Sequence, residues 1–213
     1  MPLQRLPAYD LDQKLIARSK QNNEALFRVY AHPGRAVVAG RGSQLEQEIH
    51  LPECRADGIP IFRRPGGGCS VFLDPGNIIV SLAAPCPDLS HTRPLFDGAT
   101  QWLLAGLKDI GISKAYIDGV SDLVLSDQKV GGTCFYHGRK TGYFSASLLY
   151  QPDLAAMCRY LKYPPKTPKY RRGRGHGQFV TALAPVLEFS SITGVIDALS
   201  AGLSHQLAPH IMP

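Results

Sequence analysis

The sequence predicts an α+β fold. Three observations support this class: short apolar or β-branched runs are frequent, segments with helical periodicity lie between them, and no segment repeats at a fixed period. The chain has 213 residues, of which 44% are hydrophobic, so it is long enough to bury an ordinary core. No internal domain boundary is evident, and we expect a single domain over residues 1–213.

The first half of the chain alternates expected helices and strands. Leu11, Leu15 and Ile16 share one face of a helical pattern that begins near residue 8. Further along, a β-branched run predicts a buried strand. The expected strands of this half are residues 25–30, 36–39, 59–62 and 78–83, and a short helix or turn is expected at residues 46–54.

The second half begins with a proline-containing loop at residues 85–94 and an amphipathic helix at residues 95–112, which Gly111 ends. Short apolar runs then predict two strand pairs, the second joined by a polar tip at residues 137–140. The expected strands are residues 115–117, 123–125, 129–136 and 143–150, and the expected helices are residues 153–161 and 191–207.

A glycine-rich stretch, F-R-R-P-G-G-G-C-S-V-F-L-D-P-G-N at residues 62–77, carries the first candidate site. Arg63 and Arg64 come just before three consecutive glycines. Backbone without side chains lets N–H groups approach a ligand closely, and two guanidiniums can neutralise an anion. This is the chemistry of a carboxylate or phosphate site, although a glycine-rich turn beside two surface arginines has the same pattern.

A second stretch, S-D-L-V-L-S-D-Q-K-V-G-G-T-C at residues 121–134, adds a cation. Asp122 precedes the apolar run, and Lys129 stands just ahead of Gly131 and Gly132. A lysine beside a backbone without side chains can reach a carbonyl or phosphate oxygen as a point charge. Taken alone, the same pattern fits a surface lysine beside a hairpin turn.

In their order and separation, the two stretches together resemble the lipoate–protein ligase branch of the biotin/lipoate ligase superfamily. That family shows R-R-x-G-G-G-x-V-x-x-D-x-G-N, then N-D-L-x, then K-x-x-G-[ST]-A, and the corresponding segments here are residues 63–77, 121–124 and 129–134. The resemblance covers about residues 25–207. It implies a mixed, largely antiparallel β-sheet with packed helices, of the biotin/lipoate ligase catalytic-domain type.

The resemblance also implies an enzyme, an adenylate-forming ligase that uses ATP and Mg²⁺. It would convert lipoic acid or octanoic acid to acyl-AMP and transfer the acyl group to a lysine of an acceptor lipoyl-domain or carrier protein. Both steps develop negative charge on oxygens, so the site needs fixed donors and cations. By resemblance Lys129 is the catalytic contact to the acyl carbonyl and the α-phosphate, and Asp122 helps to hold Mg²⁺. The implied substrate- and nucleotide-binding residues are Arg63, Arg64, Gly66, Gly67, Gly68, Asp74, Asn77, Val130, Gly131 and Thr133.

Several positions depart from the family pattern. Leu73 and Ser145 stand where the family often has histidine, and Ser121 stands where it has asparagine. The loss of both histidines changes the expected acyl pocket, so the choice between lipoate, octanoate and another short acyl group stays open. Asp74 and Asn77 flank a Pro-Gly turn, which offers a structural explanation for both. Many relatives carry a small additional C-terminal domain, so three alternatives stay open: a separate small accessory subunit assists the chain, the chain uses preformed acyl-adenylate, or it acts alone.

The five cysteines leave a second mechanism open, because related enzymes transfer acyl groups through a cysteine thioester without ATP. Those enzymes place the cysteine shortly before the lysine or just ahead of a V-T-x-L segment, and residues 115–128 and 161–179 contain none. Cys134 and Cys69 are the remaining candidates, and both fit small core side chains. The odd number of cysteines and the absence of a C-x-x-C pair predict reduced thiols.

A strongly basic segment follows at residues 162–178, K-Y-P-P-K-T-P-K-Y-R-R-G-R-G-H-G-Q, where much of the net charge of +6 lies. Its prolines and glycines predict a mobile loop. By resemblance to the ligases, this loop would cover the adenylate or meet an acidic acceptor protein. A basic nucleic-acid-binding protein is the alternative, which we do not favour because only Tyr163 and Tyr170 are interleaved. No apolar run is long enough for a membrane span and no signal peptide is recognisable, so a cytoplasmic protein without a membrane partner is expected.

Overall fold

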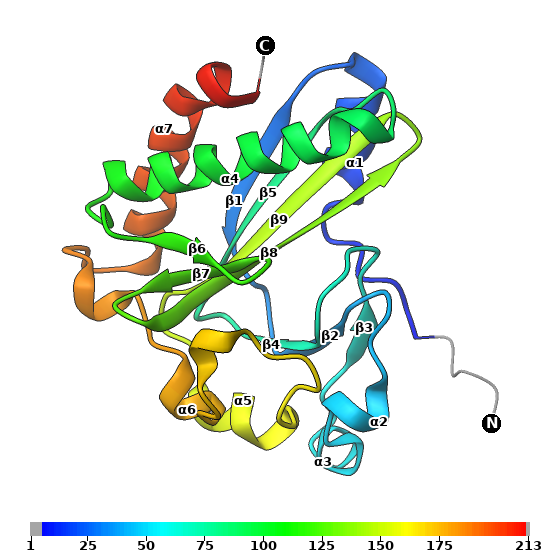
Figure 1. Ribbon diagram of the computed structural model, residues 1–213, viewed down its shortest axis with the longest axis vertical. Helices are drawn as coiled ribbons and strands as arrows, with labels where there is room; N and C mark the ends of the chain where they lie inside the picture. Colours follow the sequence, from blue (N-terminus) through cyan, green and yellow to red (C-terminus); the bar gives the residue numbers. More distant parts are fainter. Residues whose placement is uncertain (1–5, 212–213) are drawn as a thin grey trace.

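The computed structural model describes residues 6–211, and its largest element is a six-stranded antiparallel sheet (Figure 1). The central pair, β5 and β9, is aligned from Asn77 opposite Leu149 to Pro85 opposite Thr141. Strand β5 is buried along almost its full length because other elements cover both of its faces. In spatial order the strands are β1 (Leu26–Ala31), β5 (Asn77–Pro85), β9 (Thr141–Leu149), β8 (Gln128–Gly138), β7 (Asp122–Leu125) and β6 (Tyr116–Asp118).

Two-residue turns join β7 to β8 and β8 to β9. Ser126 and Asp127 form the first turn with φ angles of 51° and 63°, and Arg139 and Lys140 form the second with φ angles of 43° and 68°. Positive φ at both central positions is the signature of the type I′ turn, whose twist matches that of the flanking strands. These turns fix the register of the three strands that carry the candidate site.

A second, three-stranded sheet lies below the large sheet in the view of Figure 1. Its central strand, β2 (Ala36–Ala39), is wholly buried and pairs in parallel with β3 (Ile61–Arg63) and antiparallel with β4 (Val71–Leu73). The glycine-rich stretch joins β3 to β4. The small sheet therefore anchors both ends of this glycine loop, residues 64–70.

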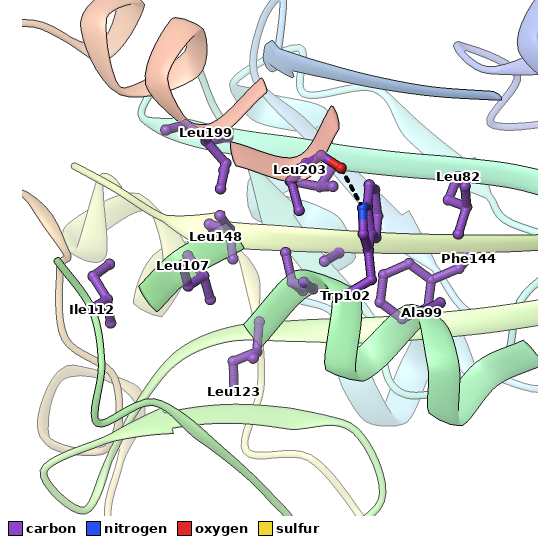
Figure 2. Close-up of a cluster of buried hydrophobic side chains, with 14 of the residues drawn as sticks. Leu82, Ala99, Trp102, Leu107, Ile112, Leu123, Phe144, Leu148, Leu199 and Leu203 are labelled. Carbon is purple, nitrogen blue, oxygen red and sulfur yellow. Dashed lines mark hydrogen bonds between the residues drawn. The ribbon is translucent and has the colours of Figure 1, made fainter. Parts of the chain in front are cut away.

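Helices α4 (Thr92–Asp109) and α7 (Ile192–Ile211) cover one face of the large sheet (Figure 1). Trp102 is fully buried between them, and its indole Nε1 donates a hydrogen bond to the carbonyl of Leu203 at 2.8 Å (Figure 2). Gly106 lets the two helices approach, since a Cβ atom at that position would lie 2.4 Å from Cδ2 of Leu203. This layer is the main hydrophobic core.

Helix α1 (Gln13–Asn22) covers the opposite face, against β1, β5 and β9. Asp12, just before this helix, is 4% exposed, and its Oδ2 accepts hydrogen bonds from the hydroxyls of Tyr143, Ser81 and Tyr30 at 2.6, 2.7 and 3.1 Å. This second face is therefore more polar than the first. The helices that pack with the small sheet are α2 (Leu45–Glu48), α3 (Leu51–Ala56), α5 (Leu154–Tyr160) and α6 (His176–Phe179).

The predicted fold class is confirmed, with a mixed and largely antiparallel arrangement of strands and packed helices. The separate small sheet is not predicted by the sequence pattern. The expected loop at residues 85–94 holds a 3₁₀ helix, η1 (Leu89–His91), and α4 begins within it at Thr92. The basic segment at residues 162–178 also contains regular structure, the 3₁₀ helix η2 (Lys169–Arg171) and most of α6, and a third 3₁₀ helix is η3 (Ala184–Val186). Among residues 6–211, no helix combines the length and apolar character needed to cross a bilayer.

Candidate active site

A β-bulge near the start of β8 determines which way Lys129 points. Leu123 of β7 pairs with Gly131, but the next residue, Val124, pairs with Lys129, so Val130 is an extra residue. Side chains alternate between the faces of a strand, and one extra residue reverses the alternation beyond it. Lys129 therefore faces the same side of the sheet as Gly132, instead of the hydrophobic core under α4 and α7.

Lys129 lies in a short chain of polar contacts. Its Nζ atom donates to Oδ1 of Asp122 at 2.6 Å, and the hydroxyl of Tyr170 donates to Oδ2 of the same carboxylate at 3.0 Å. Lys129 is 27% exposed and Asp122 is 15% exposed, so solvent weakens this ion pair only in part. Burial first, and then the charge of Asp122, raises the pKa of Tyr170 well above its usual range, which keeps its hydroxyl a donor.

The glycines after Lys129 serve different purposes. A Cβ atom on Gly132 would lie 3.3 Å from Nζ of Lys129, so the missing side chain leaves room for the ammonium group. A Cβ atom on Gly131 would lie 2.7 Å from the carbonyl oxygen of Ser147, on the neighbouring strand. Val130 is buried in the hydrophobic core, and the backbone N–H of Thr133 donates to the carbonyl of Ser121 at 2.8 Å. Of these positions, only Gly132 lies against the ammonium group.

The two arginines before the glycine loop bind backbone carbonyl groups. Arg64 donates from Nη1 to the carbonyl of Val38 at 2.9 Å and from Nη2 to the carbonyls of Gly67 and Cys69, both at 2.8 Å. Arg63 donates from Nη1 to the carbonyl of Gly40 at 2.6 Å. In this arrangement both guanidiniums hold the loops together, and their predicted contact with a ligand stays a prediction.

The glycine loop packs closely against its neighbours. A Cβ atom on Gly66 would lie 3.0 Å from Sγ of Cys134, and one on Gly40 would lie 1.9 Å from the carbonyl oxygen of Gly68. Gly68 has a φ of 91°, which favours glycine. Gly67 has open space where a side chain would be. Close packing thus explains Gly66 and the positive φ angle explains Gly68, so Gly67 is the loop glycine without a structural explanation.

Asp74 and Asn77 form the turn between β4 and β5. The side-chain oxygen Oδ1 of Asn77 accepts from the backbone N–H of Asp74 at 2.8 Å, and the carboxylate of Asp74 accepts from the N–H groups of Gly76 and Asp153. Asp74 is 3% exposed and Asn77 is fully buried. These contacts give both residues a structural role, and the predicted contact of Asn77 with a phosphate stays a prediction.

The chain just after the basic segment, residues 162–178, contacts the backbone of Lys129. After this segment, Thr181 donates its N–H to the carbonyl of Lys129 at 2.9 Å, and Val180 forms an isolated parallel bridge with Lys129. Within the segment, Tyr170 binds Asp122, as described above. Sequence reasoning did not assign Tyr170 to the site, and its only signal was an aromatic residue among cations.

The candidate thiols are poorly suited to nucleophilic attack. Burial is the largest cause that raises the pKa of Cys134, and burial followed by the charge of Glu48 raises the pKa of Cys69. A raised pKa keeps a thiol protonated, whereas the thiolate is the nucleophile. The cysteine route therefore gains no support from the environments of these two residues.

A small cavity lies on the same face of the sheet, beyond the glycine loop. Its volume is about 40 Å³, and its lining includes Tyr9, Asp12, Gly66, Cys134 and Tyr143. A larger hollow of about 260 Å³ lies beside His32 and Phe62. Lys129 lines neither of them. For comparison, a cavity of about 150 Å³ holds a benzene molecule, so the small cavity has no room for a ligand of that size.

Comparison with known proteins identifies the family. A family model described as "Lipoyl protein ligase A/B catalytic domain" matches residues 5–204. The chain belongs to this family. The resemblance inferred from the glycine loop and the lysine strand is thereby confirmed.

Relatives of this lipoyl ligase catalytic domain are longer proteins. The "Probable lipoate-protein ligase A" of Mycoplasma pneumoniae is 26% identical over 151 residues, which cover 71% of this chain and 44% of the relative. The protein of the same name from Mycoplasma genitalium is 24% identical over the same shares. The chain therefore spans less than half the length of these curated relatives.

Solved structures share the fold of this catalytic domain. A lipoate-protein ligase A bound with ATP superimposes with a TM-score of 0.76 at 22% identity, covering 92% of this chain and 78% of that chain. A structure described as a bi-partite lipoate protein ligase and its E2 lipoyl domain, from Thermoplasma acidophilum, gives a TM-score of 0.72 at 22% identity, covering 95% and 82%. These likenesses establish the biotin/lipoate ligase type of fold that the resemblance implied.

Proposed function

We propose that this protein is a lipoate–protein ligase that activates lipoate or octanoate with ATP and transfers the acyl group to a lysine of an acceptor lipoyl-domain protein. Family membership supports the reaction class, and the likeness to a ligase A structure bound with ATP supports the nucleotide. The single observation that carries the proposal is the position of the Lys129 ammonium group. Its Nζ lies 2.6 Å from Oδ1 of Asp122 and beside Gly132, which has no side chain.

The first step makes the acyl-adenylate. An oxygen of the acyl carboxylate bonds to the α-phosphorus of ATP, and the bond from that phosphorus to the bridging oxygen breaks, so that pyrophosphate leaves with the electron pair. Negative charge is shared by the oxygens of the α-phosphate as this happens. Lys129 exchanges its carboxylate partner for these oxygens, and a fixed cation stabilises the charge without reorganisation of solvent.

The second step transfers the acyl group. The neutral amine of the acceptor lysine attacks the acyl carbonyl carbon, the bond from this carbon to the AMP oxygen breaks, and the amine loses a proton to solvent. AMP leaves as an anion beside Lys129, which again balances the charge. The protein needs no nucleophile of its own for this sequence, in agreement with the protonated state that burial favours for Cys69 and Cys134.

The residues of the site do not fit a resident metal ion. Both oxygens of Asp122 accept hydrogen bonds, from Lys129 and Tyr170, and among residues 6–211 no group of three His, Cys, Asp or Glu side chains is placed to hold a metal. Mg²⁺ is commonly bound by one or two carboxylates together with substrate phosphates. Asp122 thus serves Lys129 in this arrangement, and we propose Mg²⁺ only as the counter-ion that ATP brings with it.

The proposed partners are an acceptor lipoyl domain and a separate accessory subunit that assists activation. The structure described as a bi-partite ligase with its E2 lipoyl domain, which shares this fold, motivates both. The proposed compartment is the cytoplasm, where thiols stay reduced, in keeping with the free state of all five cysteines, which lie in the described part of the chain.

The test measures acyl transfer to a purified lipoyl domain, with ATP and either lipoate or octanoate, and separately with preformed lipoyl-AMP or octanoyl-AMP. Lys129→Met should lower the rate of transfer by about 10²–10³-fold, the scale for removing one fixed group that stabilises developing charge. Lys108→Met, at an exposed position on α4, is the matched control. Normal transfer by Lys129→Met would sink the proposal, and transfer from an acyl thioester without ATP would favour the cysteine route instead.

A further inference from the structure

Tyr9 lies between the small cavity and the larger hollow, and it lines both of them. On the side of the hollow, its ring stacks on that of His32, with 6.0 Å between the ring centres and 13° between the planes. The ring centre of Phe62 is 6.2 Å away. On the other side, Asp12 and Cys134 line the small cavity and are close enough to act on the pKa of the Tyr9 hydroxyl. The side chain of Tyr9 therefore separates the two spaces.

The hydroxyl of Tyr9 gains nothing from this position. Burial first, and then the charge of Asp12, raises the pKa of Tyr9 above its usual range, so the hydroxyl keeps its proton. It is nevertheless buried without a hydrogen bond to any described residue. A buried donor without an acceptor destabilises the arrangement that contains it. The side chain is thus held by ring packing alone, which a ligand can replace.

The backbone of Tyr9 is held more firmly, beside the strand that leads into the glycine loop. The N–H of Tyr9 donates to the carbonyl of Arg63 at 2.9 Å, and the N–H of Arg63 donates to the carbonyl of Pro7 at 2.9 Å. Between them, Ala8 forms a parallel bridge with Arg63, the last residue of β3. A rotation of the Tyr9 side chain can therefore join the two spaces without breaking this pairing.

The small cavity lies on the face of the sheet that Lys129 and Gly132 occupy. Side chains alternate along a strand, so Cys134 and Tyr136 of β8 follow on the same face, and both line the cavity. Two residues of a strand span about 7 Å, which is the separation between Gly132 and Cys134 along β8. An extended chain of eight carbons, with bonds of about 1.5 Å, is longer than this. A carboxyl group at Lys129 would thus bring the far end of such a chain to the cavity.

The volumes of the two spaces indicate what the ring of Tyr9 excludes. The small cavity has about 40 Å³ and the hollow about 260 Å³. Joined, they reach the lower limit of about 300 Å³ for small-molecule pockets. Leu11, Pro33 and Phe62 line the hollow, so it suits the hydrocarbon end of a chain.

We propose that Tyr9 determines which acyl chains the protein accepts, because its ring ends the acyl pocket unless the chain displaces it. The inference rests on the proposed ligase function and adds a specificity-determining residue to it. With the ring in place, only a short acyl group fits in front of Asp12 and Cys134. With the ring displaced, the end of a medium-length apolar chain occupies the hollow beside His32 and Phe62, and its burial offsets the lost ring packing.

Calorimetry with hexanoyl-, octanoyl-, decanoyl- and dodecanoyl-AMP measures the chain-length profile without the activation step. Displacement of the ring opposes long chains in the wild type. Tyr9→Ala should therefore raise the affinity for dodecanoyl-AMP relative to hexanoyl-AMP by about tenfold or more, the gain from burying about two further methylene groups. Tyr9→Phe keeps the ring, so its ratio should stay within about threefold of the wild type. Leu89→Ala, at an exposed position on η1, is the control whose ratio should not change.

Tyr9→Leu covers the case in which the alanine variant does not fold, because leucine keeps apolar packing on His32 and Phe62 but is shorter than tyrosine. Its ratio should exceed that of the wild type by about threefold or more. A profile of the leucine or alanine variant that runs parallel to the wild-type profile would overturn the inference. A shift of the same size in Tyr9→Phe would also overturn it, since the hydroxyl and not the ring would then set the limit.

The outcomes also separate this inference from the ligase proposal. Acyl transfer that depends on Lys129, together with a length profile that does not change in Tyr9→Ala, would overturn the role of Tyr9 and leave the ligase proposal standing. A profile that shifts in Tyr9→Ala, in a protein that binds acyl-AMP but transfers no acyl group, would support the role of Tyr9 and contradict the ligase. A wild-type protein that binds no acyl-AMP would overturn both.

Discussion

Asp122 neutralises Lys129 before any ligand arrives. The two side chains are 2.6 Å apart and both are largely buried, so the ammonium group must exchange this carboxylate for a ligand anion. The exchange lowers the apparent affinity for the ligand, because the ion pair has to be broken. It also keeps the ammonium in position, since Tyr170 fixes the other oxygen of the same carboxylate.

We predict that Asp122→Asn binds AMP more tightly, by about three- to tenfold, in a buffer with EDTA. Asparagine keeps an oxygen that can accept from Tyr170 but no longer holds Lys129 as an ion pair, and a pair of this kind is worth about 1 kcal/mol. Calorimetry measures the change, and Asp97→Asn, at an exposed ion pair on α4, is the control. Weaker AMP binding by Asp122→Asn would mean that the carboxylate assists the ligand instead of competing with it.

At single positions, the sequence indicated which residues belong to the candidate site better than it indicated which groups their side chains contact. Lys129 and Asp122 were singled out, and they do contact each other. The expected contact of Arg63 and Arg64 with a ligand stays a prediction, and both donate to carbonyl groups of neighbouring loops, contacts that no local pattern encodes. Arg171, which is buried, was read as part of a charged segment, because nothing in the sequence distinguishes it from Arg172, which is exposed.

At the scale of elements, α4 and α7 support the sheet from the side opposite to the site. Trp102 joins both helices to the sheet through its buried ring and its bond to the carbonyl of Leu203. The strands that carry Lys129 and Asp122 rest on this layer, since Leu123 and Val130 belong to the same core. The packing under the site therefore determines how firmly the site is held.

We predict that Trp102→Ala lowers the free energy of unfolding by about 3–5 kcal/mol, the usual cost of removing a large aromatic side chain from a core. Denaturation in guanidinium chloride, followed by circular dichroism, provides the value. Lys108→Ala on the exposed side of the same helix should change it by less than about 0.5 kcal/mol. A loss below about 1 kcal/mol for Trp102→Ala would show that the core repacks around the gap.

Local and non-local pairings differ in how well the sequence predicts them. The pairs β6–β7 and β8–β9 join neighbouring segments, and the sequence predicted both. The pairing of β2 with β3 and β4 brings together segments that are separated by helices and by the glycine loop. Alternation of apolar residues marks a strand but does not name its partner, so the small sheet could not be predicted.

For the molecule as a whole, the excess positive charge lies in the basic segment. Residues 162–178 contain six of the 23 lysines and arginines and none of the 17 aspartates and glutamates, so 17 cations and 17 acids remain elsewhere. The net charge of +6 thus belongs to the segment whose Tyr170 contacts Asp122 and whose following residues contact the backbone of Lys129. A concentrated field of this kind attracts anionic ligands and acidic partners to the site.

One buried and one partly buried histidine, His32 and His176, make the stability of the fold depend on pH. His32 is 4% exposed, its Nδ1 faces the carbonyl of Gly34, and its Nε2 is buried without a partner. Burial lowers the pKa of His32 and of His176 below the ordinary value of 6.5. The unfolded chain therefore binds more protons just below pH 6.5, so this contribution to stability is complete above pH 6.5 and is lost as the pH falls.

We predict that the free energy of unfolding falls between pH 7.5 and pH 5.5, and that His32→Asn makes this decline shallower. Urea denaturation at several pH values measures the slope, and His205→Asn, at an exposed position on α7, is the control. Parallel slopes for the wild type and His32→Asn would show that His32 titrates alike in the folded and unfolded chain.

Because of the β-bulge at Val130, the number of residues between Asp122 and Lys129 determines which face of the sheet the Lys129 side chain lies on. Any side chain that packs in the core can replace Val130 without turning the lysine, but removing the residue, or inserting one beside it, sends the ammonium group to the other face of the sheet. A short deletion could thus silence the site in a protein that keeps its lysine, its glycines and much of its fold. Such a protein would match the sequence motifs of the family and still lack the activity. The number of residues between Asp122 and Lys129 therefore indicates an active site as much as the two residues themselves do.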